Sequence, residues 1–392
     1  MHSSASTPTS AGTVFHLIRT GEAATRAALA RHTGASPSTM ALRIGELIEG
    51  GYIEETGEGA SSGGRRPRTL AVTDAPQVVA GVDLGENHAV LVLLNRSGET
   101  VATAVHDVSL RRSPDEVLAQ LLDHAHALAA ETPGRRTLTG IAVSLPGPVD
   151  GRTGRLLSPT RMPGWNGVDV RERLEALGGL PTLVGNDANS MAVGEFASRD
   201  GEIRDLLFVK AGSGIGCGSI VNGSLYTGFR GVAGDISHTT LKDAPPIACS
   251  CGRVGCLDMV ASASAIVEAL RERGSHVESI EDVLALARNM DPAASEVVRE
   301  AGRRVGEVLA TIVNFINPQL VALGGQLSTS DAFTAGVRQA IYTLCLPMTT
   351  DLLEIAVARS GRTAGATGIA WQLLENQLQP GAIDAFLHPH EG

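Results

Sequence analysis

The chain has 392 residues, of which 43% are hydrophobic, 46 are glycine and only 19% are charged. This composition can bury a large core and excludes a wholly disordered chain, while the length favours two or three domains. No apolar run reaches the roughly 18 residues that span a bilayer, and the polar N-terminus lacks a signal-peptide pattern, so we expect a soluble, cytoplasmic protein with no membrane partner.

The formal net charge of −10 argues against a nucleic-acid partner for the chain as a whole. The distribution of charge is more informative than the total. Residues 1–75 contain as many arginines as acidic residues, so the whole net negative charge falls on residues 76–392. The N-terminal segment is therefore the part of the chain whose charge permits contact with a polyanion.

Three short helices are predicted in this N-terminal segment. Val14, Leu17 and Ile18 have helical spacing, Thr25 has the side chain of an N-cap, and Ser36 followed by Pro37 is typical of a helix start. A Gly-containing turn at Thr33-Gly34 precedes the third helix. Three helices arranged in this way predict a helix-turn-helix, although a small oligomerisation or protein-docking module has the same pattern.

In a helix-turn-helix the third helix presents its first residues to the major groove of DNA, which here would be Ser38, Thr39 and Arg43. A predicted hairpin follows directly, with strands at 52–55 and 69–72 and a glycine-rich tip. Arg65 and Arg66 in this hairpin could enter a minor groove or neutralise phosphates. A basic run is more often a solvated linker, but its position favours a winged helix-turn-helix over residues 1–75 that binds double-stranded operator DNA.

After a linker at 74–76 the sequence changes to Gly-punctuated apolar strands. Strands are predicted at 78–84, 89–94, 100–108, 139–145, 205–211, 215–221 and 319–323, and helices at 114–131, 259–272, 280–289 and 292–316. The βββ-αβ plan occurs twice, which predicts a duplicated, two-lobed α/β fold. We place the lobes at 76–200 and 201–392, with a ligand cleft between them.

Four local motifs carry possible chemistry. Asp187 follows a strand and opens a helix, where a carboxylate could act as a general base, although an aspartate there is more often only a cap. Strand ends and glycine turns suited to phosphate contacts occur at Asp83, Gly85, Gly212, Gly214 and Gly324. These turns are weak signals singly, because most Gly-rich turns serve only to reverse the chain.

The strongest motif is a cysteine cluster. Cys249, Cys251 and Cys256 lie within eight residues, and His238 stands eleven residues before the first of them. Three thiolates and an imidazole provide the four protein ligands of a closed, structural Zn²⁺ site. Three unrelated buried cysteines would leave the close spacing and the flanking glycines unexplained.

Together these motifs resemble the ROK family (repressors, open reading frames and kinases), and specifically its winged-helix transcriptional regulators. The resemblance extends from about Thr13 to the helix near 364–374. It is carried by the zinc signature and by three segments: 146–150 (PGPVD), 185–189 (GNDAN) and 231–238 (GVAGDISH). It implies an actin-like sugar-kinase fold in which zinc shapes a sugar pocket and a C-terminal helix returns to the first lobe.

The resemblance also implies site residues. The family's sugar pocket corresponds to Asn186, Asp187, Asp235, His238 and Asp258, with Asp187 at the position of the catalytic base. The family usually has glutamate at the positions of Asp235 and Asp258. Its kinases carry Asp-x-Gly-Gly-Thr where this chain reads DLGENH from Asp83, which places the negative Glu86 against ATP phosphates. Kinase activity is therefore expected to be absent or vestigial.

We interpret the sequence as a sugar-responsive transcriptional regulator, in particular a repressor of carbohydrate genes. A sugar or sugar phosphate would be its effector, and a homodimer would bind a two-fold-symmetric operator. The rival hypothesis is an ATP-dependent hexose kinase with an appended DNA-binding domain. A third is a regulator that responds to another protein, with a purely structural zinc lobe.

Overall fold

The computed structural model describes residues 9–58, 68–157, 162, 164–199 and 201–388. The N-terminal segment forms the helices α1 (Ala11–Arg19), α2 (Arg26–Thr33) and α3 (Pro37–Glu49) and an antiparallel hairpin of β1 (Ile53–Glu58) with β2 (Arg68–Val72). The predicted caps are confirmed, because the side chains of Thr25 and Ser36 accept hydrogen bonds from the backbone N–H groups of Ala28 and Thr39.

The first sheet has the strand order β5-β4-β3-β6-β7. Its strands are β3 (Gln77–Leu84), β4 (His88–Leu94), β5 (Thr100–Asp107), β6 (Thr137–Leu145) and β7 (Thr182–Asn186). Side chains alternate between its two faces. Val78, Ala80 and Val82 pack beneath α4 (Pro114–Glu131) and α5 (Val170–Gly178), whereas Val79 packs against the C-terminal helix α13 (Ala364–Gln377).

The second sheet repeats this plan, with the order β10-β9-β8-β11-β12. Its strands are β8 (Leu206–Ala211), β9 (Ile215–Val221), β10 (Ser224–Leu225), β11 (Leu320–Gly324) and β12 (Glu354–Val357). In both sheets the first three strands are antiparallel and the last two run parallel to the central strand. The sequence-based prediction of a duplicated α/β fold is therefore confirmed.

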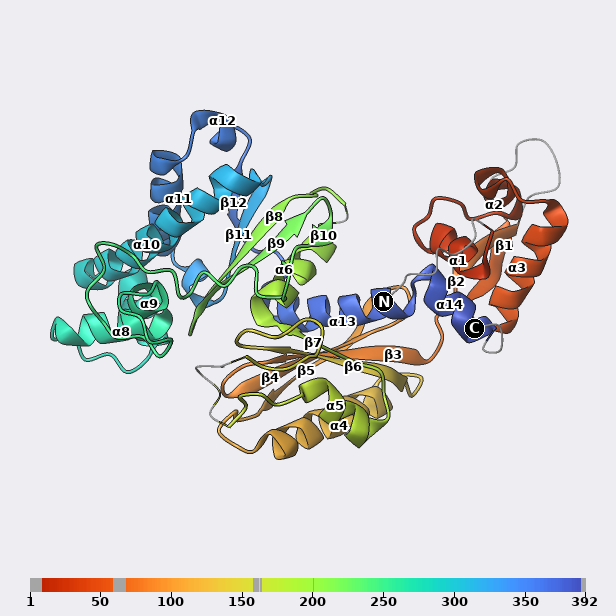
Figure 1. Ribbon diagram of the computed structural model, residues 1–392, viewed down its shortest axis with the longest axis horizontal. Helices are drawn as coiled ribbons and strands as arrows, with labels where there is room; N and C mark the ends of the chain where they lie inside the picture. Colours follow the sequence, from red (N-terminus) through yellow and green to blue (C-terminus); the bar gives the residue numbers. More distant parts are fainter. Residues whose placement is uncertain (1–8, 59–67, 158–161, 163, 200, 389–392) are drawn as a thin grey trace.

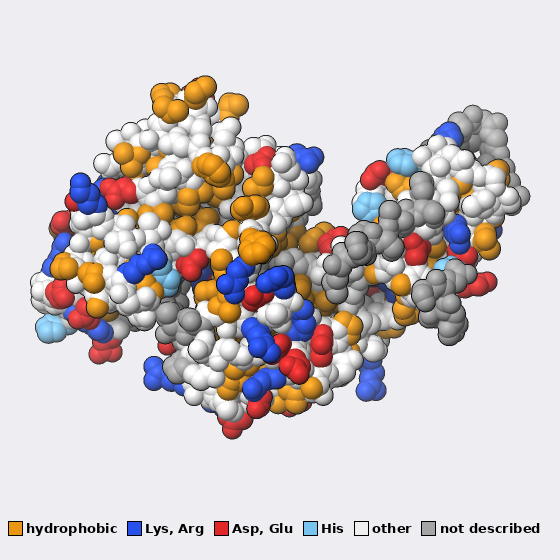
Figure 2. Space-filling model, in the orientation of Figure 1, with side chains coloured by type: hydrophobic (Ala, Val, Ile, Leu, Met, Phe, Trp, Pro, Cys, Tyr) orange, Lys and Arg blue, Asp and Glu red, His pale blue; other side chains and the backbone are white. Residues whose placement is uncertain are grey.

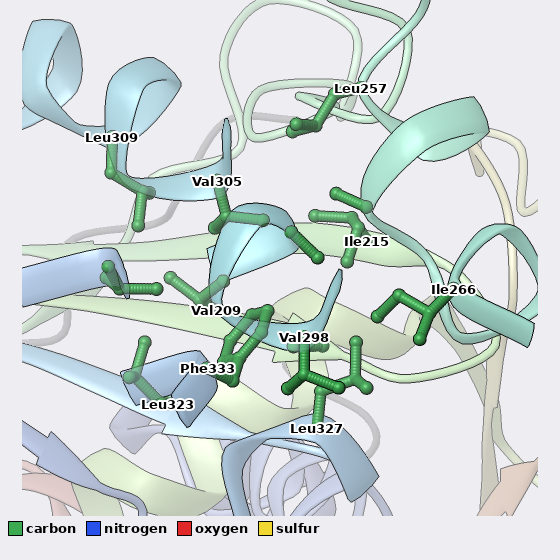
Figure 3. Packing of buried hydrophobic residues seen from close by; sticks show 14 of the residues in the cluster. Val209, Ile215, Leu257, Ile266, Val298, Val305, Leu309, Leu323, Leu327 and Phe333 are labelled. Atoms are coloured by element: carbon green, nitrogen blue, oxygen red, sulfur yellow. The ribbon is translucent and has the colours of Figure 1, made fainter. Parts of the chain in front are cut away.

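Helices also cover both faces of the second sheet. Leu206 and Phe208 face α6 (Asp187–Ala197), whereas Leu207 and Val209 point into the large core under α10 (Pro292–Ile316). Figure 3 shows this core, in which Val298 and Val305 of α10 and Phe333 surround Val209. The remaining helices of this lobe are α7 (Asp258–Ala261), α8 (Ala263–Glu272), α9 (Ile280–Arg288), η1 (Gln326–Thr329), α11 (Asp331–Leu344), α12 (Pro347–Thr350) and η2 (Gly361–Thr363).

One predicted helix is wrong in detail. The structure divides the helix expected over 259–272 into α7 and α8 at Ser262. Ser262 has an extended backbone, with φ −72° and ψ 161°, and its side chain caps α8. The apolar periodicity continues across the break, which is why the pattern alone predicted a single helix.

Helix α13 returns from the second sheet to the first, and α6 crosses it closely (Figure 1). Glycines make this crossing possible. A Cβ atom on Gly368 would lie 1.8 Å from the Ser190 carbonyl oxygen, and one on Gly194 would lie 2.1 Å from that of Ala364. Any larger residue at either position would therefore separate the helices that join the two lobes.

The final helix α14 (Pro380–Leu387) lies against the N-terminal helices rather than against either sheet (Figure 1). Asp384 accepts a 2.7 Å hydrogen bond from the backbone N–H of Gly12 at the start of α1. Arg19 of α1 forms an ion pair with Glu375 and lies over the ring of Trp371, both on α13. One apolar cluster thus runs from the three N-terminal helices through the two C-terminal helices to the first sheet.

Within the described ranges, none of the helices has both the length and the apolarity that a membrane crossing requires.

Candidate functional site

A cavity between the lobes brings together all five residues that the resemblance assigned to a sugar pocket. Asn186 and Asp187 enter it from the junction of β7 and α6, Asp235 and His238 enter from the loop after β10, and Asp258 enters from the start of α7. Backbone at 146–148, 213–217 and 231–234 completes the wall. The glycine-rich lining exposes peptide groups, so the cavity offers many hydrogen-bonding partners for a polar ligand.

Asn186 and Asp187 are held by the start of α6. The Asn186 side chain accepts a 3.1 Å hydrogen bond from the Asn189 N–H as the N-cap, and its amide nitrogen donates to the Gly147 carbonyl at 3.0 Å. Asp187 accepts a 2.7 Å hydrogen bond from the N–H of Ala188 and is only 7% exposed. The helix N-terminus stabilises its negative charge. Asn186 is therefore the cap of α6, and its neighbour Asp187 is the candidate base.

Lys210 is a residue of this site that sequence reasoning missed. It stands in the otherwise apolar strand β8, and its ammonium group forms an ion pair with the second carboxylate oxygen of Asp187. This contact joins the central strand of the second sheet to the first residue of α6, the helix that also packs against that sheet. The signal in the sequence was a single lysine within LLFVKA, in a chain with only one other lysine.

Asp235 and Asp258, the two cavity positions at which the family usually has glutamate, have different hydrogen-bond partners. Asp258 accepts a 3.0 Å hydrogen bond from the N–H of Ile215, which ties it to the start of β9. Asp235 is exposed and accepts a 2.6 Å hydrogen bond from the hydroxyl of Ser237. Deeper in the wall, the side-chain oxygen of Asn189 is buried and has no protein hydrogen-bond partner in the described part of the chain. An oxygen in this state is suited to accept a ligand hydroxyl.

The four predicted metal ligands converge on one point. The ligand atoms of His238, Cys249, Cys251 and Cys256 all lie within 4.8 Å of one another. The Cys251 and Cys256 sulfurs are 3.6 Å apart, and His238 Nδ1 is 3.4 Å from the Cys249 sulfur. Tetrahedral zinc with metal–sulfur bonds of about 2.3 Å requires separations of roughly 3.5–3.8 Å. The donor set and its spacing therefore fit a metal ion.

This cluster is part of the cavity wall. The backbone of 239–241 pairs with that of 255–257, and Asp258 N–H donates to the Ser237 carbonyl at 2.9 Å. His238 lines the cavity and also belongs to the cluster. A metal held there would fix the positions of His238 and of the segment that leads to Asp258.

The residues assigned to a nucleotide site lie at strand ends. Gly212 and Gly214 form the turn after β8, and Gly324 ends the neighbouring parallel strand β11, where it packs beneath the Phe208 ring. Asp83 is the last residue but one of β3 and accepts a 2.6 Å hydrogen bond from the hydroxyl of Ser144. Burial raises the pKa of Asp83, and this effect exceeds the lowering by the Ser144 hydrogen bond.

The first of these turns is tight. Gly85 N–H donates to the His88 carbonyl at 2.8 Å, and a Cβ atom on Gly85 would lie 2.9 Å from Cε1 of the His88 ring. Glu86 and Asn87 are exposed at its tip. The imidazole thus occupies the space directly beside Gly85.

Three of the predicted DNA-contacting residues lie on α3. Ser38 is exposed at the start of α3 and Thr39 is half-buried beside it. Arg43 lies one helical turn after Thr39, where it forms a 3.0 Å ion pair with Glu46 and donates to the Thr9 carbonyl at 3.2 Å. Arg65 and Arg66 lie outside the described residues.

Residues 79–376, three quarters of the chain, match the ROK family. The chain belongs to the ROK family. A xylose repressor from Caldicellulosiruptor bescii is 28% identical over 346 residues, which cover 84% of this chain and 86% of the repressor.

Two solved structures, one of a ROK regulator and one of a ROK kinase, cover different shares of this chain. A ROK transcriptional regulator described as a homologue of the Escherichia coli MLC protein matches with a TM-score of 0.80 and 27% identity, covering 96% of this chain and 98% of that one. A ROK hexokinase from Thermus thermophilus matches with a TM-score of 0.63 and 26% identity. The hexokinase is covered completely, yet it reaches only 80% of this chain. This ROK chain therefore extends beyond the kinase fold as the regulator does.

Proposed function

We propose that this ROK protein is a sugar-responsive transcriptional repressor of carbohydrate genes. The observation that carries the proposal is the combination of an N-terminal three-helix and hairpin unit with an interlobe cavity lined by Asn186, Asp187, Asp235, His238 and Asp258. The likeness to a ROK regulator over 96% of the chain and to a xylose repressor supports it. The three domains at 1–75, 76–200 and 201–392 are part of this proposal, with α13 returning to the first lobe.

In this function the effector is a sugar or sugar phosphate bound in the interlobe cavity. The carboxylates of Asp187, Asp235 and Asp258 accept hydrogen bonds from its hydroxyl groups, and Asn186 and Asn189 extend this array. One structural Zn²⁺ per chain, held by His238, Cys249, Cys251 and Cys256, shapes the wall of the pocket. Four protein ligands leave no open position on such a metal for a catalytic water.

Phosphoryl transfer is not part of the proposed function. Transfer from ATP depends on positioned cationic groups around the phosphates, and Glu86 places a negative charge in the turn that would face them. His88 fills the space beside Gly85. The carboxylate at the base position, Asp187, is paired with Lys210. A kinase with an appended DNA-binding domain remains the rival, and any catalytic activity would be vestigial.

The DNA-binding unit would read a two-fold-symmetric operator as a homodimer, with Ser38, Thr39 and Arg43 at the major groove and Arg65 and Arg66 in the wing. A candidate face for the second copy is the exposed apolar surface around α12, where Leu346, Met348 and Leu352 are 60%, 80% and 94% exposed (Figure 2). Sugar binding that closes the lobes would change the spacing of the two DNA-binding units.

Calorimetric titration tests the proposal directly. The purified protein is titrated with hexoses, pentoses, aminosugars and their phosphates, beside Asp187→Ala and the control Asp115→Ala, whose carboxylate is exposed on α4. We expect one sugar class to bind the natural chain and the control, and not Asp187→Ala. Sugar phosphorylation by the natural chain that is lost in Asp187→Ala would overturn the proposal in favour of the kinase.

A further inference from the structure

A second cavity lies at the joint between the N-terminal unit and the first lobe, away from the interlobe cavity. It has a volume of about 360 Å³, which is within the usual size range of small-molecule sites. Three parts of the chain line it: the turn between α3 and β1, the end of the first sheet, and the helices α13 and α14. The proposed function does not use this cavity.

The walls are mostly apolar. Val79 and Leu94 line the cavity from the sheet, Leu374 from α13, and Phe386 from α14. Tyr52 of the N-terminal unit contacts α14, and the centre of its ring is 6.0 Å from that of Phe386 in an edge-on arrangement. A ligand with a compact hydrocarbon body would gain favourable free energy by displacing water from this surface.

One cationic group faces these walls. Arg96, just after β4, lines the cavity with its guanidinium carbon 4.5 Å from the centre of the Tyr52 ring. It donates hydrogen bonds to the Gly51 carbonyl and to the side-chain oxygen of Gln77. These bonds use two of its five N–H donors. Among the described residues, no carboxylate forms an ion pair with Arg96, whereas Arg19 and Arg136 each have one.

We propose that this cavity is a second effector site, for a small amphipathic carboxylic acid. The guanidinium of Arg96 would pair with the carboxylate, and the hydrocarbon body would lie against Leu94, Leu374 and Phe386. A carboxylate is the natural partner here because arginine binds it through two parallel hydrogen bonds, and because the half-buried cation has no other anionic partner in the described chain.

Occupancy of this site would act on DNA binding. Gly50 and Tyr52 belong to the turn that follows α3, so a bound acid would contact the DNA-reading unit and the two helices that hold it. Helix α13 also crosses α6, whose first residue is Asp187. The two cavities are therefore linked through one helix, and coupling between their ligands is expected to be reciprocal.

The test uses 4-phenylbutyrate and its uncharged amide, 4-phenylbutanamide, titrated calorimetrically into the full zinc-loaded chain. We expect one phenylbutyrate to bind per chain, and the amide to bind roughly tenfold more weakly or worse, because it lacks the charge that pairs with Arg96. Arg96→Gln should cause a similar loss. Asp115→Ala should leave phenylbutyrate binding unchanged, because that exposed residue lines neither cavity.

A second variant separates a lost site from a damaged fold. Ala382 lines the cavity from α14 and is exposed, so Ala382→Phe would fill the cavity without entering the core. Ala385→Phe adds the same ring to the same helix outside the lining and should bind normally. The proposal is overturned if phenylbutyrate does not bind, if acid and amide bind equally, or if binding survives Ala382→Phe. Failure of every sugar to bind would instead count only against the proposed function.

Discussion

At the scale of single residues, the most deeply buried charges of the described chain belong to Glu195 on α6 and to Arg199, two residues past the end of that helix, which are 0% and 2% exposed. Glu195 accepts hydrogen bonds from Arg199 Nε at 2.9 Å and from the N–H and hydroxyl of Ser360 at 2.9 and 2.6 Å. Burial raises the pKa of this carboxyl, but the hydrogen bonds from Ser360, Arg199 and Arg359 together outweigh it and lower the pKa. The pair ties α6 to the segment before α13.

Glu195→Gln should lower the free energy of unfolding by about 3 kcal/mol, because it leaves the Arg199 cation buried without its partner. A carboxyl whose pKa is lower in the folded protein stabilises the fold above its unfolded pKa of about 4.5, and this contribution disappears as the pH falls. The difference in the free energy of unfolding between the natural chain and Glu195→Gln should therefore decrease below about pH 4.5. Urea denaturation at several pH values measures it.

The control for this prediction is Glu202→Gln. Glu202 pairs with Arg359 at 3.5 Å, but both side chains are exposed. An exposed pair contributes about 0.5 kcal/mol or less. Equal losses in the two variants would mean that the buried pair has no special role.

The metal cluster leads to a second residue-scale prediction. Cys251→Ser should remove the zinc and with it sugar binding, because His238 belongs both to the cluster and to the cavity wall. Elemental analysis gives the zinc content and calorimetry gives the sugar affinity. Cys345→Ser changes a buried cysteine outside the cluster and should keep one zinc per chain. Zinc-free natural protein would refute the site.

At the scale of elements, the hairpin of β1 and β2 is placed for a wing because it follows α3 directly. Arg65→Ala combined with Arg66→Ala should weaken operator binding and reduce the slope of log affinity against log salt by about 2, since each phosphate contact releases a counterion. Fluorescence anisotropy over a series of salt concentrations measures the slope. Arg288→Ala, on α9 of the second lobe, is the control, and an unchanged slope in the double variant would remove these arginines from the DNA.

Arg43 should behave differently from the wing arginines. If it reaches a base edge, it must first leave its ion pair with Glu46. Arg43→Ala should then relax sequence preference, with a loss of about 1–3 kcal/mol of discrimination at one base pair. Competition between operator variants measures it, and a uniform loss across sequences would assign Arg43 to the DNA backbone.

At the scale of the whole molecule, the C-terminal helices α13 and α14 connect the lobes to the N-terminal unit. In the proposed function the turn at 85–88, with Glu86 exposed at its tip and the His88 ring beside Gly85, excludes ATP phosphates. ATP turnover should be undetectable in the natural chain. In Glu86→Gly combined with Asn87→Thr, nucleotide binding should become measurable by calorimetry if those two residues alone exclude the phosphates. Binding of ATP by the natural chain would contradict this.

The sequence by itself determined the local features. The caps at Thr25 and Ser36, the bounds of α4 and α10 and the cysteine cluster follow from spacing and side-chain chemistry within a few residues, and the structure has them as predicted. The duplicated strand plan was also visible, because buried strands leave a continuous apolar signal in the chain. The resemblance then named the cavity residues, which the structure brings together.

Only the tertiary structure decided which distant segments meet. The pairing of Lys210 with Asp187 joins β8 to the start of α6, 23 residues apart in the chain, and neither residue shows its partner in the local pattern. The place of α14 against α1 depends on the close approach of Gly12 to the Pro380 carbonyl, more than 360 residues apart in the chain. The cavity beside Arg96 exists because three such segments pack imperfectly there. Spacing along a chain encodes helices, strands and short metal motifs, but contacts between lobes arise from shape and charge matched across the folded molecule.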